Sequence, residues 1–160
     1  MQKGIATLEI ILVTLIISIL AAAAIPNVER VLDRVALDYE TKKFYTDLRF
    51  VQSFDRAAHM EDNHFNTMKD NRVSLIVYPE KYIFRKISAY KDLGEHSFSR
   101  GVTASKKNNS QYWQIQFDDM GKIDPAETNH LTLTSGLGKK TYIIFDSVGR
   151  FRGSRTKPDD

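Results

Sequence analysis

The chain contains no cysteine, which excludes a disulfide framework, a cysteine-ligated zinc or iron–sulfur site and a thiol nucleophile. It also carries little excess charge, because 23 Lys and Arg residues against 20 Asp and Glu residues give a formal net charge of +3. That total is too small to indicate nucleic-acid binding by itself. At 160 residues, one folded domain is the default expectation.

The usual enzyme and metal motifs are missing as well. His59 and His64 are five residues apart with no Glu in the metalloprotease position, and His96 and His130 are isolated. Residues 135–140 lack the first glycine and the final Ser or Thr of a phosphate-binding loop. The spacing of an EF-hand is absent from the acidic residues of one segment, which are Asp118, Asp119, Asp124 and Glu127. We therefore expect no enzyme, no metal site and no cofactor.

What the chain does have is one long apolar run near its start. Residues 5–25 form 21 consecutive positions with a single charge, Glu9. A helix of that length spans about 30 Å, the hydrocarbon thickness of a bilayer. A helix also satisfies its own backbone hydrogen bonds in lipid. We predict a membrane helix here, and the short N-terminal flank favours a cytoplasmic N-terminus with the remainder outside.

A cleaved secretory signal is the alternative interpretation of the same segment. Lys3 would belong to the charged start, and residues 21–23, all alanine, would supply small residues for cleavage. Two features oppose this alternative: the apolar core is longer than a signal needs, and Glu9 lies within it. A carboxylate in lipid costs about 2.5–3.5 kcal/mol on insertion scales, so its presence indicates a function.

The motif of residues 3–9, Lys-Gly-Ile-Ala-Thr-Leu-Glu, resembles the processing motif of type IV pilins and of the pseudopilins of type II secretion. The resemblance implies cleavage after Gly4 by a prepilin peptidase, N-methylation of Ile5, and Glu9 as the fifth mature residue. Pro26 then matches a helix-bending proline of the family. Ile5 departs from the family's usual Phe, and the four-residue leader is short.

Cleavage would expose an ammonium group at Ile5, and the Glu9 carboxylate of a neighbouring subunit could pair with it. Such a pair would fix the axial register between subunits of a filament. Pro26 removes a backbone donor, so we expect a bend or an opening near residues 22–26.

The helical pattern continues beyond Pro26 to an end expected near residues 60–63. One apolar stripe is expected along this half, beginning with Val28, Val31, Leu32, Val35 and Tyr39 and continuing with some drift through Phe44, Leu48, Val51 and Ala58. The aromatic residues of this half should pack in the core or in a filament; they are Tyr39, Phe44, Tyr45, Phe50 and Phe54.

The remainder of the chain reads as strands and turns. Hairpins are predicted from residues 73–78 with 82–87 and from residues 131–134 with 141–146, and an edge segment is expected to begin at Phe151. Residues 112–117 form a further strand, and residues 88–110 are expected to be a long surface loop. The predicted fold is an α+β lollipop, in which one long helix packs on an antiparallel sheet.

This fold divides the chain into four segments. They are a leader (residues 1–4), an assembly and transmembrane half of the helix (5–26), an amphipathic half (27–62) and a β-rich extracytoplasmic head (63–160). The order of elements, ending in the motif of residues 145–150, is similar to that of the GspH/FimT-like minor pilins, although this likeness is looser than the N-terminal one.

Positive charge is concentrated at the end of the chain. Six basic and three acidic residues lie between Lys139 and Asp160. Residues 149–152, Gly-Arg-Phe-Arg, resemble a pattern of DNA-uptake minor pilins. If this segment is extended, Arg150 and Arg152 point to one side and could straddle phosphates. The candidate DNA-binding residues are Arg150, Arg152, Lys139, Lys140 and Arg155; the alternative, a solvated basic edge strand, is favoured over DNA binding.

The function expected from these residues is structural. The chain would be a minor pilin or pseudopilin subunit that starts in the bacterial inner membrane and enters a pilus-like filament. Its partners would be the prepilin peptidase, other subunits and the inner membrane. A DNA-binding minor pilin of natural transformation, with double-stranded DNA as partner, is one alternative. A membrane-anchored or secreted soluble domain is the other.

Overall fold

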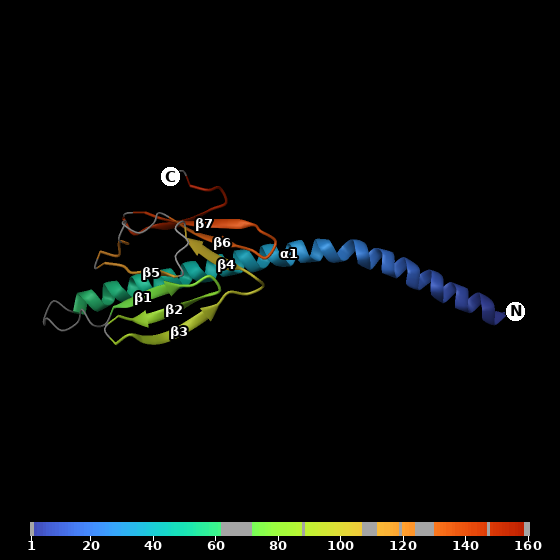
Figure 1. Ribbon diagram of the computed structural model, residues 1–160, viewed down its shortest axis with the longest axis horizontal. Helices are drawn as coiled ribbons and strands as arrows, with labels where there is room; N and C mark the ends of the chain where they lie inside the picture. The colour runs from blue at the N-terminus through green and yellow to red at the C-terminus, as the bar shows by residue number, and fades with distance from the viewer. Residues whose placement is uncertain are drawn as a thin grey trace.

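The structure is a computed structural model that describes residues 2–61, 72–87, 89–106, 112–118, 120–123, 130–146 and 148–158, with the side chains of the first range described for residues 8–57. Its main features are one long N-terminal helix and two antiparallel sheets that pack on the C-terminal half of this helix (Figure 1). This is the predicted α+β lollipop: the N-terminal half of the helix projects from the head alone.

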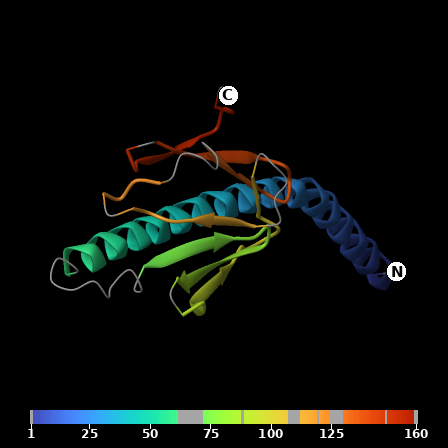
Figure 2. The same cartoon turned by 60° about the vertical axis from the view of Figure 1, so that its left-hand side comes forward.

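Helix α1 runs over Gln2–Glu61, so its 60 residues end where the sequence predicts. Pro26 lies inside the helix, yet α1 continues through it unbroken. Asn27 donates its side-chain amide to the carbonyl of Ala23 at 3.5 Å, next to the position where the proline removes a donor. Figure 2 shows α1 curved between its two halves. α1 is therefore curved and stays helical through residues 22–26.

The head consists of two four-stranded sheets. The first has the strand order β3-β2-β1-β5, formed by Lys91–Ser97, Lys81–Lys86, Val73–Val77 and Trp113–Ile115. The second has the order β4-β6-β7-β8, formed by Thr103–Lys106, His130–Thr134, Lys140–Phe145 and Phe151–Ser154. The two predicted hairpins are β1–β2 and β6–β7, both antiparallel.

One part of the sequence interpretation is wrong. Residues 88–110, expected as a loop, contain the strands β3 and β4. β3 is an edge strand whose side chains are mostly exposed, so it lacks the alternation of apolar and polar residues that marks a half-buried strand. β4 has only four residues and buries only Ala104 among them. The predicted edge segment at Phe151 is confirmed as β8.

The core lies between α1 and the two sheets. Phe44, Leu48 and Val51 on the helix are fully buried, and each contributes about 1.5–3 kcal/mol of hydrophobic stabilisation. They belong to one cluster with residues of both sheets, among them Leu75, Trp113, Leu131 and Ile143. Because the sheets pack only on the C-terminal half of α1, the side chains of residues 8–32 are all exposed.

Candidate functional site

The inward face of α1 carries a row of four buried acidic side chains, which we call the acid row: Asp33, Glu40, Asp47 and Asp55. Their exposed fractions are 6%, 0%, 7% and 2%. Steps of seven, seven and eight residues return to nearly the same helix face, so all four point toward the head. A buried carboxylate is tolerated only when hydrogen bonds replace its water. Each member of the acid row therefore needs its own partners in the head.

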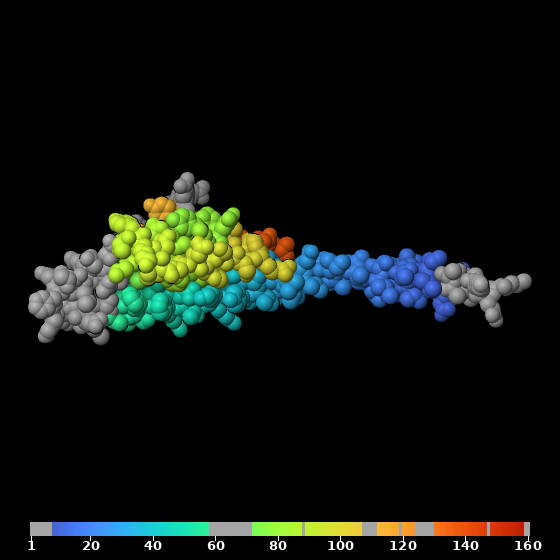
Figure 3. Space-filling model, turned by 90° about the horizontal axis from the view of Figure 1, so that it is seen from below, coloured from blue at the N-terminus to red at the C-terminus, as the bar shows by residue number. Residues whose placement is uncertain are grey.

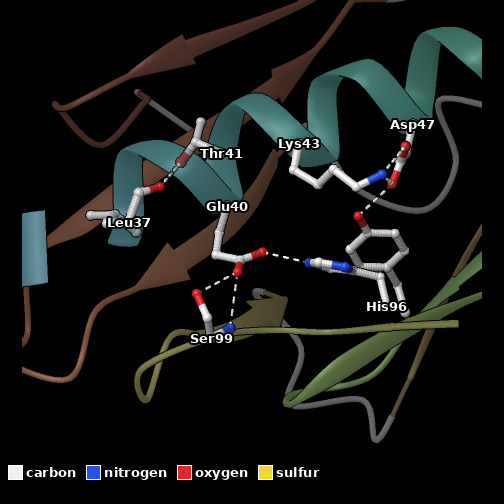
Figure 4. A network of polar contacts seen from close by, with 8 residues as sticks. Leu37, Glu40, Thr41, Lys43, Asp47, His96 and Ser99 are labelled. Atoms are coloured by element: carbon white, nitrogen blue, oxygen red, sulfur yellow. Dashed lines mark hydrogen bonds and ion pairs between the residues drawn. The ribbon is translucent and has the colours of Figure 1, made fainter. Parts of the chain in front are cut away.

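Glu40 is the fully buried member (Figure 4). One carboxylate oxygen accepts hydrogen bonds from the Ser99 backbone N–H at 3.0 Å and from the Ser99 hydroxyl at 2.6 Å, and the other oxygen lies 2.7 Å from His96 Nε2. Burial by itself raises the pKa of Glu40, but the hydrogen bonds from Ser99 and His96 outweigh it and leave this pKa below its usual value. Glu40 thus fixes the turn between β3 and β4 to the helix as a carboxylate.

Asp47 binds β2, the strand next to β3 in the first sheet. The hydroxyl of Tyr82, on β2, donates to Asp47 at 2.6 Å. The ammonium of Lys43 lies 2.8 Å from the same carboxylate (Figure 4). Burial, followed by the hydrogen bond and the charge of Asp47, raises the pKa of the Tyr82 hydroxyl, so it remains a donor. The Tyr82 ring packs edge-on against Phe44 with the centroids 5.2 Å apart, which places this polar contact inside the apolar core.

Asp33 and Asp55, the first and last members of the acid row, bind the β6–β7 turn and the start of β1. Asp33 accepts from the Ser135 hydroxyl at 2.7 Å and from the Leu137 backbone N–H at 3.0 Å, in the β6–β7 turn. Asp55 accepts from the backbone N–H of Val73 at 3.0 Å, where β1 begins. Burial raises the pKa of Asp55 to about 6, although hydrogen bonds from Val73 and Phe117 and the charge of Arg72 act against this rise.

Gln52 adds a neutral contact between Asp47 and Asp55. Its side-chain amide donates to the carbonyls of Gly121 at 2.6 Å and of Gly149 at 2.8 Å, and so joins two turns to the helix. Gly149 has a φ of +80°, and a Cβ there would overlap the Gly121 carbonyl. The glycine of the Gly-Arg-Phe-Arg motif therefore has a structural explanation that is independent of any ligand.

The acid row was missed by the sequence analysis. A detectable signal was present, because acidic residues recurring every seven or eight positions among apolar ones mark a single helix face. The consequence is structural, because these polar contacts set both sheets of the head at one register along α1.

The opposite, outward face of α1 is apolar without being covered. We call this surface the outer strip; its members are 39–60% exposed and are Val28, Val31, Leu32, Val35 and Tyr39. The expected single stripe is therefore wrong, since these residues face away from the core while Phe44, Leu48 and Val51 face into it. Figure 3 shows the helix uncovered along one side of the head and bare beyond it. The outer strip continues the apolar surface of residues 8–25.

The aromatic residues of this half divide in the same way. Phe44 lies in the core, while Tyr39, Phe50 and Phe54 are 57%, 58% and 40% exposed. Phe50 contacts the ring of Phe84 on β2, with centroids 6.4 Å apart. The aromatic side chains of residues 27–62 are therefore split between the core and the exposed surface of α1.

The predicted assembly residues lie on the projecting half of α1. Gly4 and Ile5 belong to the helix, and their side chains lie outside the described residues. Glu9 is exposed, and no described residue forms an ion pair or hydrogen bond with its carboxylate. Pro26 is exposed and lies inside the helix. Within the described part of the chain, one helical segment, Leu8–Ala57, is long and apolar enough to cross a membrane.

The five candidate DNA-binding cations are spread along the β7–β8 hairpin. Arg150 precedes β8, has an 82% exposed side chain and lies 3.5 Å from Asp146; Arg152 is exposed within β8. Lys139 and Lys140 lie at the start of β7, at the same end as Arg155, because Ser154 pairs with Tyr142. The structure therefore separates Arg150 from the other end of the hairpin and does not gather the five cations into one cluster.

The histidines and the acidic residues considered for metals have structural neighbours. His96 contacts Glu40, and His130 is buried with its ring 5.9 Å from that of Tyr142. Asp118 accepts from the backbone N–H of Lys122 in a turn. Over the described residues, no group of three or more potential ligands is arranged to hold a metal ion. His59, His64, Asp119, Asp124 and Glu127 lie outside the residues whose side chains are described.

Comparison of the chain with protein families, with curated proteins and with solved structures finds no match. The layout, a long apolar N-terminal helix on antiparallel sheets, is pilin-like, and this likeness is one of architecture.

Proposed function

We propose that this chain is a minor pilin or pseudopilin subunit of a type IV pilus-like filament, of type II secretion or a related system. The observation that carries the proposal is the outer strip on α1. Val28, Val31, Val35 and Tyr39 are each more than half exposed and continue the apolar surface of the membrane-spanning residues. An apolar surface that extends beyond the membrane on a water-exposed helix requires a cover, and helices of neighbouring subunits would provide it.

Two further features support an assembly role. Glu9 stands in the apolar span without a described partner, so a charge from another subunit, the ammonium of a processed Ile5, would neutralise it. The acid row holds the head to the opposite side of α1, which leaves the outer strip free for lateral contact. In this proposal the helix forms the filament interior and the head lies outside.

Before assembly, the same helix would anchor the chain in the inner membrane. The N-terminus would be cytoplasmic and the head extracytoplasmic, and a prepilin peptidase would cut after Gly4. No residue is proposed to act in catalysis, because the function is carried by surfaces. The four segments proposed for the chain (residues 1–4, 5–26, 27–62 and 63–160) correspond to leader, anchor, head-bound helix and head.

The absence of cysteine makes the lateral contact directly testable. In the cysteine-free chain, a single Val35→Cys substitution places one thiol on the outer strip. Oxidation in membranes should join two copies of the variant through a disulfide at this position and so give crosslinked dimers. Lys91→Cys, on the exposed edge strand β3, is the matched control and should give few crosslinked products. Equal crosslinking at both positions, or none at Val35→Cys, would contradict the proposal.

The mature N-terminus provides an independent test. Mass spectrometry of the membrane-extracted protein should find a methylated Ile5 as the first residue. An unprocessed Met1, or an end at Ala24, would favour instead an anchored or secreted soluble domain.

DNA binding is a second candidate function, favoured by the exposed cations Arg150 and Arg152 on the β7–β8 hairpin. Binding of duplex DNA to phosphate contacts should weaken as salt increases. Arg150→Ala combined with Arg152→Ala should then reduce the affinity, whereas Lys86→Ala combined with Lys91→Ala, on the other sheet, should not. Unchanged binding by the arginine variant would rule out this motif as the DNA site.

A further inference from the structure

A groove of about 350 Å³ runs between α1 and β8, which we call the α1–β8 groove. Three of the seven residues that line it are positively charged and none is negative; they are Lys42, Tyr45, Thr46 and Arg49 on α1 and Phe151, Arg152 and Gly153 on β8. Within the described part of the chain, no acidic side chain forms an ion pair with these three cations. The groove therefore presents positive charge that the head itself leaves uncompensated.

Aromatic rings form one wall of the groove. Tyr45 and Phe151 stack nearly parallel with their centroids 5.7 Å apart, and the guanidinium of Arg49 lies 6.0 Å from the Phe151 centroid. The Tyr45 hydroxyl is buried without a hydrogen-bond partner. Burial raises its pKa to about 12, so it stays neutral. This packing fixes β8 beside the helix and holds the groove in shape.

The strand β8, whose residues line the groove, has a free backbone edge. Among the described strands it is the last of its sheet and pairs with β7 on one side. The Asp146 N–H donates to the Arg150 carbonyl at 2.7 Å, so residue 150 faces β7. In an antiparallel pair these bonds alternate, which directs the backbone groups of Arg152 toward β7 and those of Phe151 and Gly153 outward. The outward groups can pair with another strand.

We propose that the α1–β8 groove binds an extended acidic segment of a partner polypeptide, which adds as a strand to the free edge of β8. Strand addition uses backbone hydrogen bonds for affinity and alternate side chains for specificity. Carboxylates on the helix-facing side of the added strand would meet Lys42 and Arg49, the two groove cations on α1. This inference goes beyond the filament role and does not depend on it.

The dimensions of the groove agree with such an occupant. From Lys42 to Arg49 the helix rises seven residues, or about 10 Å. An extended peptide of three residues covers about the same length, at about 3.3 Å per residue. A nucleic acid could satisfy the cations but would leave the outward N–H and C=O groups of β8 without a strand to pair with. The observations therefore favour a peptide.

The test measures binding of short probes to the detergent-solubilised full chain by fluorescence anisotropy. The main probe is a labelled Glu-Val-Glu-Val-Glu peptide. Its controls are the same peptide with Gln for Glu, the same peptide with alternate backbone nitrogens methylated, and single- and double-stranded DNA oligonucleotides. We expect saturable binding of the acidic peptide and at least tenfold weaker binding of both modified peptides, because one loses the charge and the other the backbone donors.

The protein variants locate the site. Lys42→Gln combined with Arg49→Gln should weaken binding of the acidic peptide about tenfold, while Lys91→Gln, on the free edge of the other sheet, should leave it unchanged. An unshifted emission of Trp113 shows that the variants are folded. Equal binding of the methylated peptide, equal losses in both protein variants, or binding of the oligonucleotides alone would each overturn the proposal. These readouts need no filament, so they are separate from the test of the proposed function.

Discussion

The carboxylate of Asp33 on α1 accepts a hydrogen bond from the hydroxyl of Ser135 at 2.7 Å, although 102 positions separate the two residues in the sequence. A second bond, from the Leu137 N–H at 3.0 Å, joins the same carboxylate to the same turn. Together they tie the β6–β7 hairpin to the helix at the first residue of α1 that the head buries. The acid row thus begins where the head begins.

Asp33→Ala should destabilise the head by about 1–3 kcal/mol, because it leaves the Ser135 hydroxyl and the Leu137 N–H without their acceptor. The measurement is urea unfolding of the detergent-solubilised chain, followed through Trp113, the single and buried tryptophan. Asp38→Ala, at an exposed position of the same helix, is the control and should stay within about 0.5 kcal/mol of the parent. Equal losses would mean that the acid row does not hold the head.

The free energy of unfolding should depend on pH through the protonation of Asp55. Its pKa of about 6 in the folded chain exceeds the ordinary value of 3.8. Between these values the folded state binds more protons than the unfolded state, so the free energy of unfolding falls as the pH rises from about 4 to 6. Two pKa units correspond to about 3 kcal/mol, an upper bound for this contribution.

Asp55→Asn removes the titrating group and keeps an oxygen that can accept from the Val73 N–H. The variant should therefore lose less stability than the parent between pH 4.5 and pH 7, as measured by urea unfolding at both values. Taking the difference between the two proteins cancels the other carboxylates, Glu40 included. A parallel pH profile for the variant would show that Asp55 is not the group responsible.

The sequence predicts this architecture best where one physical requirement dominates. The apolar run requires a helix in lipid, and the turn at residues 79–80 separates two short runs rich in β-branched and aromatic residues. The prediction from the sequence fails at β3, because an edge strand that buries almost no side chains shows no hydrophobic pattern. The loop assigned to residues 88–110 is the direct result.

The faces of α1 show a different limit. Both faces have helical periodicity: Val28, Val31 and Val35 recur on one side, and Phe44, Leu48 and Val51 on the other. Periodicity gives the spacing within a face but does not say what covers that face. The inward face is in fact the one with four acidic residues, and these become visible as structural only when their partners, such as Ser99 and Tyr82, are located.

A pair of substitutions should reveal how closely β8 packs on the helix. A Cβ added at Gly153 would lie 2.7 Å from the Tyr45 hydroxyl. Gly153→Ala should therefore cost about 1–3 kcal/mol through overpacking. Tyr45→Phe alone should be neutral or stabilising, since the buried hydroxyl has no partner to lose.

The double variant should recover most of the loss, so that a double-mutant cycle gives a coupling energy of the same size. Simple additivity of the two substitutions would contradict the close approach of Tyr45 to Gly153. Unfolding followed through Trp113 is again the measurement.

The last prediction concerns Glu9, the one charge in the apolar span. Glu9→Leu should insert in the membrane at least as well as the parent, because it removes a charge that costs about 2.5–3.5 kcal/mol in lipid. It should nevertheless fail to enter filaments, because the ammonium of a neighbouring Ile5 would then have no partner in the filament interior. The measurement compares the sheared filament fraction with the membrane fraction of the producing cells by immunoblotting. Thr14→Leu, at another exposed polar position of the span, controls for the added apolar surface and should assemble normally, since the Thr14 hydroxyl bonds only to its own helix at Ile10 and Ile11. Normal assembly of Glu9→Leu would refute the pairing, whereas failure of both variants would attribute the defect to the surface of the helix rather than to its charge.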